Sequence, residues 1–337
     1  MRLCRPLRPP RPRRARPSPH GSARRLCAYP NPTATLGLHN LELVSIRVRS
    51  CLAHLLHDVG MDSMPTPTVA PSWLLAHLAR QDLRILDVRW ALQSGSQRAA
   101  YDAGHIPGSV FVDLDSDLAG PPGAMGRHPL PSLERFCEAM RAAGVSSDSS
   151  VVIYDEVTGA AARAWWLLKS CGHDRVAVLD GGLSAYLEAG GELTDEPTTV
   201  VPGTLSASQF GHTIPADLIG ARQDQGHLVL DARARDRYRG APNPLDPRPG
   251  HLPGAKSLPW TDLYRAGVLL EREEIRRRLQ EVGHDKEQPV VAYCGSGVTA
   301  CALLLGLAAA GLDQLYLYPG SWSEWAADPS RPVTTQD

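Results

Sequence analysis

Residues 290–300, VVAYCGSGVTA, indicate both the fold class and the domain organisation of the chain. A run of β-prone apolar residues ends at Cys294, a glycine-rich turn follows, and an alanine- and leucine-rich segment begins behind it. A near copy, VVIYDEVTGAA, occupies residues 151–161 and has Asp155 in the place of the cysteine. Strand, glycine turn and helix in this order are typical of an α/β unit. The two copies indicate that the unit occurs twice and carries a thiol only in the second copy.

Three further motifs repeat in the same order. LDVR at residue 86 returns as LDAR at residue 230, GHIPG at 104 returns as GHLPG at 250, and Gly181 in LDGG corresponds to Gly320 in YPGS. The offsets are 144, 146 and 139 residues, and the two strand–turn segments are also 139 residues apart. A nearly constant offset over ordered motifs indicates tandem homologous domains. We therefore expect an α/β fold with two such domains, each a mainly parallel sheet flanked by helices.

The hydrophobic pattern predicts elements and boundaries for these domains. In the first domain we expect a helix at 71–79, strands at 83–90 and 175–180, and an amphipathic helix at 160–171 that Gly172 ends. We assign the first domain to residues 66–192 and the second to residues 213–333. Residues 193–212 are polar and contain proline, glycine and threonine, a composition typical of a linker.

Residues 1–64 are expected to form a disordered, Arg/Pro-rich extension outside both domains. Residues 1–60 hold eleven arginines, no lysine and two acids, so their formal charge of +9 leaves −10 for the rest of a chain whose net charge is −1. Within residues 1–20, MRLCRPLRPPRPRRARPSPH, the prolines argue against a helix and the composition cannot bury a core. Three alternatives remain open for this segment. It is an organellar transit peptide, or a basic tail that binds nucleic acid, or it is translated from an upstream start while Met61 or Met64 is the working initiator.

The overall composition argues against several classes of protein. With 43% hydrophobic and 21% charged residues the chain is expected to be soluble, and no apolar run approaches the ~20 residues that span a bilayer. The acidic balance beyond residue 60 argues against a nucleic-acid partner. The seven cysteines include no C-x-x-C pair, which disfavours a zinc site or a disulfide framework and favours a reducing compartment. We expect a cytoplasmic protein, with the mitochondrial matrix as the alternative if residues 1–60 are a transit peptide.

Cys294 is the candidate nucleophile. Open α/β sheets bind ligands at the carboxyl ends of their strands, where CGSG places small residues whose N–H groups can converge on one point. The helix that follows favours an anion at its N-terminus, so a thiol there is expected to ionise readily and to attack as a thiolate. The alternative is a small buried hydrophobic residue. Asp155 cannot do this chemistry, so the first domain is expected to be catalytically silent, and Cys301 is expected to pack rather than react.

These segments together resemble the tandem-domain rhodanese family. The resemblance covers residues 68–333 and rests on the CGSGVTA loop with GHIPG, LDVR, WWLL, LDGGL, RYRG, PRPGHLPG and GSWSEW. Within the family, the loop is similar to that of the 3-mercaptopyruvate sulfurtransferases. The resemblance implies that Cys294 takes a sulfur atom from a small-molecule donor, holds it as a persulfide and passes it to cyanide or to a thiol such as thioredoxin or glutathione. It implies no metal and no organic cofactor.

The resemblance also implies roles for residues around Cys294. Ser296, with Asp115 in FVDLD and His128 in GRHPLP, corresponds to the proton relay of the family's mercaptopyruvate enzymes. Arg239 and Arg248 correspond to the arginines that hold the donor's carboxylate and ketone, a task that suits the planar guanidinium group. The other residues expected to line the donor site are Gly295, Gly297, Val298 and Thr299.

The remaining repeated polar residues are expected to be structural. Asp87 and Asp231 should brace the ends of equivalent strands. His105 and His251, which recur in GHIPG and GHLPG, should mark a turn.

Three alternative functions remain open beside transfer from 3-mercaptopyruvate. Thiosulfate is a dianion, and the family's thiosulfate enzymes usually carry Arg and Lys directly after the cysteine, where this chain has Gly295 and Ser296. A cysteine phosphatase or arsenate reductase needs an arginine six positions after the cysteine, where this chain has Ala300. A tandem binding module without activity is the third alternative, against which the complete loop around Cys294 argues.

Overall fold

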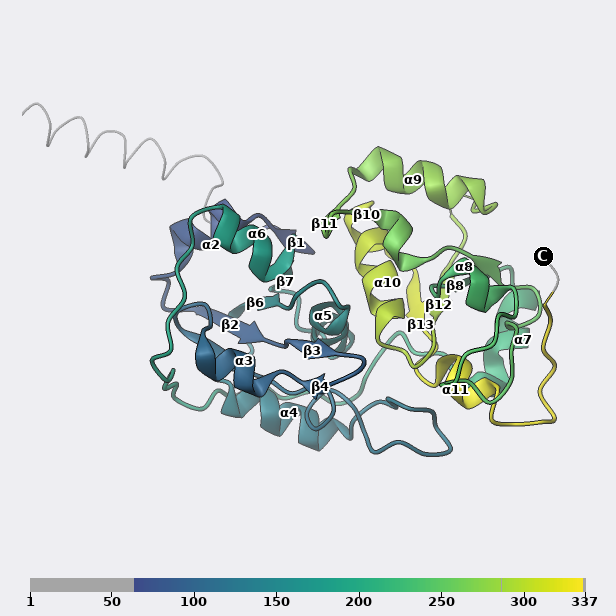
Figure 1. Ribbon diagram of the computed structural model, residues 1–337, viewed down its shortest axis with the longest axis horizontal. Helices are drawn as coiled ribbons and strands as arrows, with labels where there is room; N and C mark the ends of the chain where they lie inside the picture. Colours follow the sequence, from purple (N-terminus) through teal and green to yellow (C-terminus); the bar gives the residue numbers. More distant parts are fainter. Residues whose placement is uncertain (1–63, 286, 336–337) are drawn as a thin grey trace, which may run out of the picture. The chain divides into compact units, whose positions relative to one another are not determined.

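The computed structural model describes residues 64–285 and 287–335, which form two consecutive α/β halves (Figure 1). The disordered extension and its alternatives concern residues 1–63, which lie outside the described residues, and so do Cys4, Cys27 and Cys51. Both halves contain a sheet whose paired neighbours all run parallel. The expected tandem α/β architecture is confirmed.

The sheet of the first half has the order β1-β7-β6-β2-β5. Its strands are β1 (Thr68–Val69), β2 (Leu83–Asp87), β5 (Ser109–Phe111), β6 (Ser150–Tyr154) and β7 (Val176–Leu179). Its helices are α2 (Pro71–His77), α3 (Arg98–Ala103), α4 (Leu133–Ala142), α5 (Ala160–Ser170) and α6 (Gly182–Glu188). A small hairpin pairs β3 (Trp90–Ala91) with β4 (Gly95–Ser96).

The sheet of the second half has the order β13-β12-β8-β9, which matches β7-β6-β2-β5 of the first half strand for strand. Its strands are β8 (Leu228–Asp231), β9 (Lys256–Ser257), β12 (Val290–Tyr293) and β13 (Leu315–Leu317). Its helices are α7 (Ile219–Asp224), α8 (Arg235–Tyr238), α9 (Arg272–Glu281), α10 (Thr299–Ala309) and α11 (Ser321–Trp325), with the 3₁₀ turns η1 (Ala216–Leu218) and η2 (Trp260–Leu263). A second hairpin pairs β10 (Tyr264–Arg265) with β11 (Val268–Leu269).

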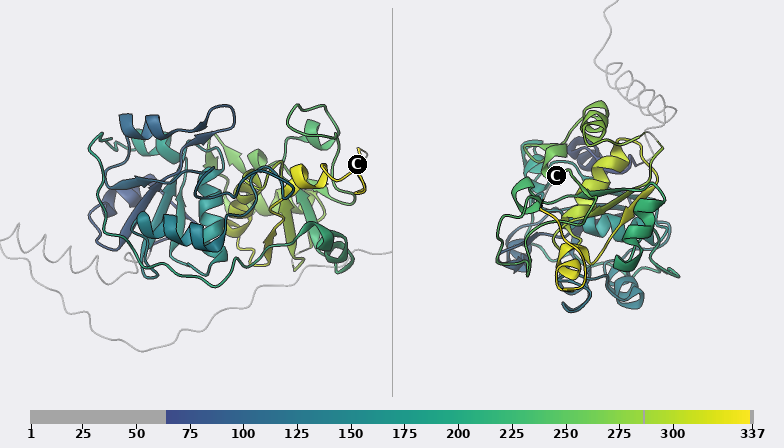
Figure 2. Two further views of the ribbon diagram at one scale, coloured as in Figure 1. Left: turned by 90° about the horizontal axis from the view of Figure 1, so that it is seen from below. Right: turned by 90° about the vertical axis from the view of Figure 1, so that its right-hand side faces the viewer.

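Alternate residues of each central strand enter different hydrophobic cores, because successive side chains of a strand point to opposite faces of the sheet. In β6, Val151 and Ile153 pack with residues of α4 and α5, whereas Val152 and Tyr154 pack with residues of α2 and α6. The second half repeats the arrangement with α10 on one face and α7 and α11 on the other. Figures 1 and 2 show helices on both sides of the strands.

The two halves share one core through α5 and α10, which pack against each other. Ten of the eleven residues of α5 are buried, as are eight of the eleven residues of α10. The amphipathic helix expected at 160–171 is therefore buried on all sides, because α10 covers the face that would meet water in an isolated domain.

The structural role expected for the repeated polar residues is confirmed. The Asp87 carboxylate accepts hydrogen bonds from Arg89, and Asp231 is paired with Arg233 in the same way. His105 Nδ1 lies 2.9 Å from Tyr101 O, and His251 Nδ1 lies 2.7 Å from Tyr238 O. Each histidine ring also stacks on that tyrosine. The repeat therefore extends from the strands to individual hydrogen bonds.

The segment between the halves runs along the first half. Gly203 donates its N–H to Arg141 O at 2.8 Å, and Leu205 donates to Val145 O at 3.1 Å. The side chain of Leu205 is buried in the shared core. This polar segment is thus fixed to the first half by backbone hydrogen bonds.

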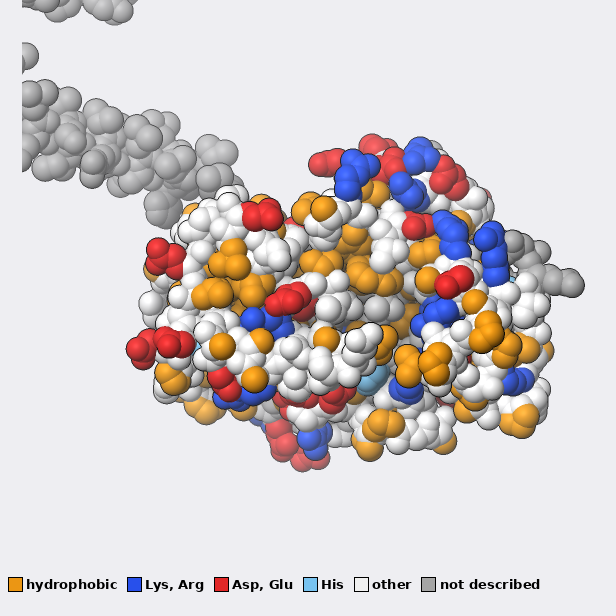
Figure 3. All heavy atoms as spheres, viewed as in Figure 1, with side chains coloured by type: hydrophobic (Ala, Val, Ile, Leu, Met, Phe, Trp, Pro, Cys, Tyr) orange, Lys and Arg blue, Asp and Glu red, His pale blue; other side chains and the backbone are white. Residues whose placement is uncertain are grey.

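The outer face of α9 carries mixed charge. Arg277 and Arg278 both pair with Glu274, and Figure 3 shows basic and acidic side chains interspersed over this helix.

Among the described helices, none combines the length and the apolar character needed to cross a membrane.

Candidate active site

The loop between β12 and α10 presents Cys294. The residue follows directly on the last strand residue, Tyr293, and its side chain is buried. Its Sγ accepts a hydrogen bond from the N–H of Gly297 at 3.1 Å. Gly297 has a φ of +81°, and a Cβ there would lie 2.3 Å from Pro319 O, so the turn requires glycine. The backbone thus holds an N–H group against the sulfur.

The helix α11 braces this loop from the other side. The hydroxyl of Ser321 accepts from the N–H of Cys294 at 3.1 Å and donates to Tyr318 O at 2.9 Å. The N–H groups of Trp322 and Ser323 donate to the carbonyl oxygens of Cys294 and Gly295, both at 2.9 Å. These bonds fix the loop before any ligand binds.

Three polar side chains form a series beside the cysteine loop. His128 Nδ1 lies 2.8 Å from Ser296 Oγ, and His128 Nε2 lies 3.4 Å from Asp115 Oδ1. Trp90 Nε1 donates to the other Asp115 oxygen at 2.9 Å and holds the carboxylate in place. Burial lowers the pKa of His128 from 6.5 to about 4, so the imidazole is neutral at neutral pH. The structure therefore brings Asp115 and His128 of the first half to Ser296, which lies 168 residues beyond His128.

Two guanidinium groups lie against the loop, and neither was predicted from the sequence. A Cβ on Gly295 would lie 2.9 Å from Arg127 Nη2 and 3.2 Å from Arg237 Nη2. Arg127 comes from the first half, and its N–H donates to Ser323 Oγ of α11 in the second half at 3.0 Å. Arg237 comes from α8. The only sequence signals were that Arg127 precedes His128 and that Arg237 lies two residues before Arg239.

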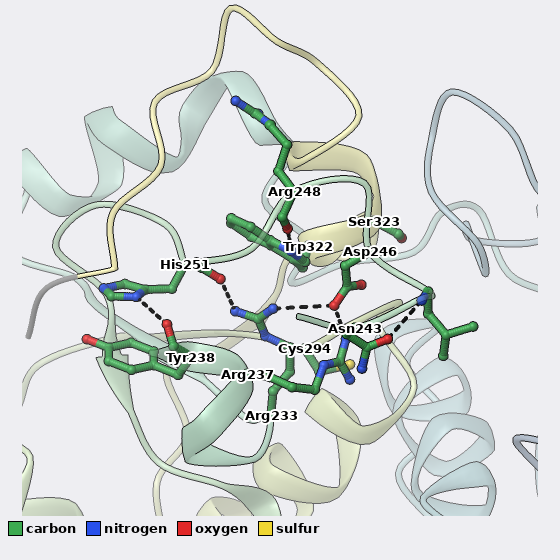
Figure 4. Close-up of polar contacts among 12 residues, drawn as sticks. Arg233, Arg237, Tyr238, Asn243, Asp246, Arg248, His251, Cys294, Trp322 and Ser323 are labelled. Carbon is green, nitrogen blue, oxygen red and sulfur yellow. Dashed lines mark hydrogen bonds and ion pairs between the residues drawn. The ribbon is translucent and has the colours of Figure 1, made fainter. Parts of the chain in front are cut away.

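Arg239 and Arg248 are not brought to this loop. The guanidinium of Arg248 donates to four backbone carbonyls around the end of α11, among them Asp328 O at 2.6 Å, and Figure 4 shows its side chain pointing away from Cys294. Arg239 lines a separate hollow with Arg235, Tyr238, Lys256, Ser257 and Glu281. The expected donor-holding role therefore has no geometric support for these two arginines.

A buried arginine of the first half also contacts the loop. Arg163 on α5 is fully buried, and its Nη1 donates to Gly297 O at 3.1 Å. Its other nitrogen atoms donate, at 3.3 Å in each case, to the carbonyl oxygens of Leu118, His128 and Pro129. Among the described residues no carboxylate oxygen lies within ion-pair distance of Arg163, which is instead held by carbonyl groups.

Cys301 lies on α10, close to the loop. It is fully buried, its thiol donates to Gly297 O at 3.3 Å, and burial raises its pKa to about 12. A thiol in this state is protonated and inert.

In the described part of the chain there is no group of three His, Cys, Asp or Glu side chains that could hold a metal ion.

The corresponding loop of the first half holds a carboxylate where the second half has a thiol. Asp155 accepts from the N–H groups of Val157 at 2.7 Å, Thr158 at 3.2 Å and Ala161 at 3.0 Å. The hydroxyl of Thr158 adds a fourth hydrogen bond at 3.1 Å. The loop after the strand is therefore an anion-binding turn in the first half, filled by its own side chain.

Comparison with known proteins finds the same two units. A model of the rhodanese-like domain matches residues 70–189 and 215–328. A probable 3-mercaptopyruvate sulfurtransferase of Pseudomonas aeruginosa is 44% identical over 273 residues, covering 78% of this chain and 96% of that protein. A putative thiosulfate sulfurtransferase, SseB, of Mycobacterium tuberculosis is 41% identical, covering 76% of this chain and 92% of that protein. The crystal structure of SseA, a 3-mercaptopyruvate sulfotransferase from Escherichia coli, superposes with a TM-score of 0.68 at 33% identity, covering 77% of this chain and all of that one.

Proposed function

This chain belongs to the rhodanese family and is a sulfurtransferase, and we propose that it takes sulfur from 3-mercaptopyruvate through a persulfide on Cys294. The observation that carries the choice of donor is the Asp115–His128–Ser296 series beside the cysteine loop. A keto-acid donor leaves as an enolate that needs a proton, whereas thiosulfate leaves as sulfite and needs none. We place the nucleophile in residues 213–333 and the linker in residues 193–212. Residues 66–192 carry no nucleophile of their own, but they contribute Asp115, Arg127 and His128 to the site.

The proposed reaction begins with attack of the Cys294 thiolate on the donor sulfur. A sulfur–sulfur bond forms and the carbon–sulfur bond breaks. The electron pair of the broken bond stays on the methylene carbon, so the leaving group is the enolate of pyruvate. The N–H of Gly297, which already donates to Cys294 Sγ, stabilises the negative charge on sulfur before and after the transfer.

The enolate then takes up the proton that the donor carried on sulfur. His128 is neutral, so its Nδ1 accepts from the Ser296 hydroxyl while the proton on Nε2 is directed to Asp115. Ser296 Oγ can accept the S–H proton as its own proton passes to His128. The reverse movement delivers a proton to the methylene carbon and gives pyruvate. A persulfide remains on Cys294.

We assign the donor's carboxylate to Arg127 and Arg237 in place of Arg239 and Arg248. Both assigned guanidinium groups lie beside Gly295, next to the nucleophile. Paired guanidinium groups bind a carboxylate with charge-assisted hydrogen bonds. The backbone from Gly295 to Thr299 lines the rest of the donor site.

Thiosulfate is the second candidate donor. Two guanidinium groups at the loop would attract a dianion, although residues 295 and 296 themselves carry no charge.

The proposed acceptor of the sulfur is a thiol such as thioredoxin or glutathione, or cyanide. The four cysteines among the described residues are free thiols, which suits the reducing cytoplasm as the proposed compartment.

The test combines kinetics with mass spectrometry. Steady-state turnover is measured in parallel with 3-mercaptopyruvate and thiosulfate, and the intact protein is weighed after incubation with each donor. We expect a higher kcat/KM for 3-mercaptopyruvate and one added sulfur atom, localised to Cys294. Cys294→Ala should lose both signals, whereas the matched variant Cys301→Ala should keep them. A persulfide on Cys301, or equal efficiency with thiosulfate, contradicts the proposal.

A further inference from the structure

Asp246 is a buried carboxylate beside the two guanidinium groups at the cysteine loop. It lies between α8 and the GHLPG turn. In this segment the side-chain oxygen of Asn243 accepts a hydrogen bond from the N–H of Leu245 at 2.8 Å, and its backbone carbonyl accepts one from the N–H of Asp246 at 3.1 Å. The Asp246 side chain is 4% exposed. These local bonds hold the carboxylate in one position, directed toward the arginines (Figure 4).

Asp246 contacts three arginines at once. Its Oδ1 lies 3.2 Å from Arg127 Nη1, and its Oδ2 lies 2.5 Å from Arg237 Nη2 and 3.9 Å from Arg233 Nη1. Arg233 already has its own counterion, since its Nη2 lies 2.6 Å from Asp231 and both side chains are buried. Asp246 is therefore the counterion of the two arginines beside Gly295.

The charges in this group can be counted. Three guanidinium groups, the carboxylates of Asp231 and Asp246 and the proposed Cys294 thiolate sum to zero. A bound monoanion therefore leaves one excess negative charge in a partly buried site and a dianion leaves two, so the dianion is the less favourable ligand. Arg237 Nε is also buried and donates to no described atom, so a donor remains for a bound anion.

We propose that Asp246 is the residue that makes the site selective for monoanionic sulfur donors over dianionic ones. The inference rests on the proposed function, because it takes the cysteine loop as the donor site. Removing the Asp246 charge raises the net charge of the group from zero to one. Both kinds of donor then bind more tightly, but the dianion gains twice, so the preference shifts toward it.

The size of the shift follows from Coulomb's law. A unit charge about 7 Å away, at an effective dielectric constant between about 20 and 80, changes binding by about three- to fiftyfold. We expect Asp246→Asn to raise the ratio of kcat/KM for thiosulfate to that for 3-mercaptopyruvate by about tenfold. A purely structural role for Asp246 would instead lower both values together and leave the ratio unchanged.

Two variants serve as controls. Asp246→Glu keeps the charge and should keep the ratio within about twofold of wild type, even if turnover falls. Asp224→Asn removes one negative charge from an exposed position on α7 and should leave the ratio unchanged. Asp246→Ser provides a second neutral variant if Asp246→Asn does not fold, as judged by circular dichroism. An unchanged or lower ratio in the neutral variant that folds overturns the inference.

A second measurement separates this inference from the choice of donor, because it needs no turnover. The rate at which iodoacetamide alkylates Cys294 is followed by intact mass with increasing pyruvate, a monoanion, or sulfate, a dianion. In wild type we expect pyruvate to protect at lower concentration than sulfate, and in Asp246→Asn we expect the order to shift toward sulfate. If neither anion protects, or if the order is the same in both proteins, the charge-selection role is refuted whatever the kinetics show.

Discussion

Replacing Arg163 by methionine should weaken the fold and the reaction together. Arg163 is carried by the first half, yet it donates to Gly297 O in the cysteine loop of the second half and to His128 O in the proposed relay. Methionine fills a similar volume without charge or donors. The substitution therefore removes these hydrogen bonds and leaves the packing of α5 against α10 in place.

The expected loss of stability can be worked out from the carbonyl partners. In the variant, Pro129 O still accepts a hydrogen bond from the N–H of Gly120, and Gly297 O still accepts one from the thiol of Cys301. The carbonyls of Leu118 and His128 lose the guanidinium, at a cost of about 1–3 kcal/mol for each buried acceptor. Methionine carries no charge, so the variant avoids the desolvation penalty of burying the guanidinium, and this offsets part of the cost. We expect a net loss of about 2–4 kcal/mol, or about 4–7 °C in Tm for a chain of this size.

The assay pairs thermal unfolding with steady-state kinetics. Because Gly297 and His128 lose their common anchor, kcat/KM for 3-mercaptopyruvate should fall by about ten- to a hundredfold at a temperature where the variant is folded. The matched control is Lys169→Met on the same helix, where the lysine forms a partly exposed ion pair with Asp174 and should contribute about 0–1 kcal/mol. Equal melting temperatures and equal turnover for the Arg163 and Lys169 variants would show that the Arg163 hydrogen bonds stabilise neither the fold nor the cysteine loop.

Two further predictions follow from the site. Burial lowers the pKa of His128 to about 4. Between pH 6.5 and pH 4 the unfolded chain therefore binds a proton at this histidine that the folded chain does not bind. The free energy of unfolding should accordingly fall by up to about 3 kcal/mol as the pH decreases over that range. Denaturant titrations of wild type and His128→Gln at pH 7 and pH 4.5 check this, and an equally steep fall in the variant would contradict it. Arg237→Gln should reduce kcat/KM for 3-mercaptopyruvate by about ten- to a hundredfold, as expected for a charge-assisted hydrogen bond, whereas Arg239→Gln should change it less than twofold. The opposite order would restore Arg239 as the residue that holds the donor.

Local patterns in the sequence predicted most of the fold. The repeated strand–turn–helix segments identified both sheets, and the glycine turn correctly placed Cys294 at the end of a strand. The resemblance to a known family supplied Asp115, His128 and Ser296, which the structure places side by side. Spacing alone could not have joined them, because 168 residues separate His128 from Ser296.

The arginines show why the rest could not be predicted. The helix α8 is only four residues long, and residues two apart on a helix point in nearly opposite directions. No sequence pattern sets the phase of so short a helix, so Arg237 and Arg239 could not be told apart. The bond between Arg127 and Asp246 spans 119 residues and depends on how the two halves pack. Arg163 lies in an apolar helix whose outer face is covered only by the other half.

The carboxylate of Asp155 has a mechanical consequence for the molecule. A loop that turns over substrate has to accept and release its anion in every cycle, whereas the loop around Asp155 carries an anion that is covalently part of the chain and cannot leave. The N–H of Ala161, in the first turn of α5, is one of the groups held by this permanent anion. The start of α5 is therefore clamped in one position throughout the reaction cycle. The copy without the cysteine thus presents a preorganised helix to α10, the helix that follows the cysteine loop, with no dependence on a bound ligand.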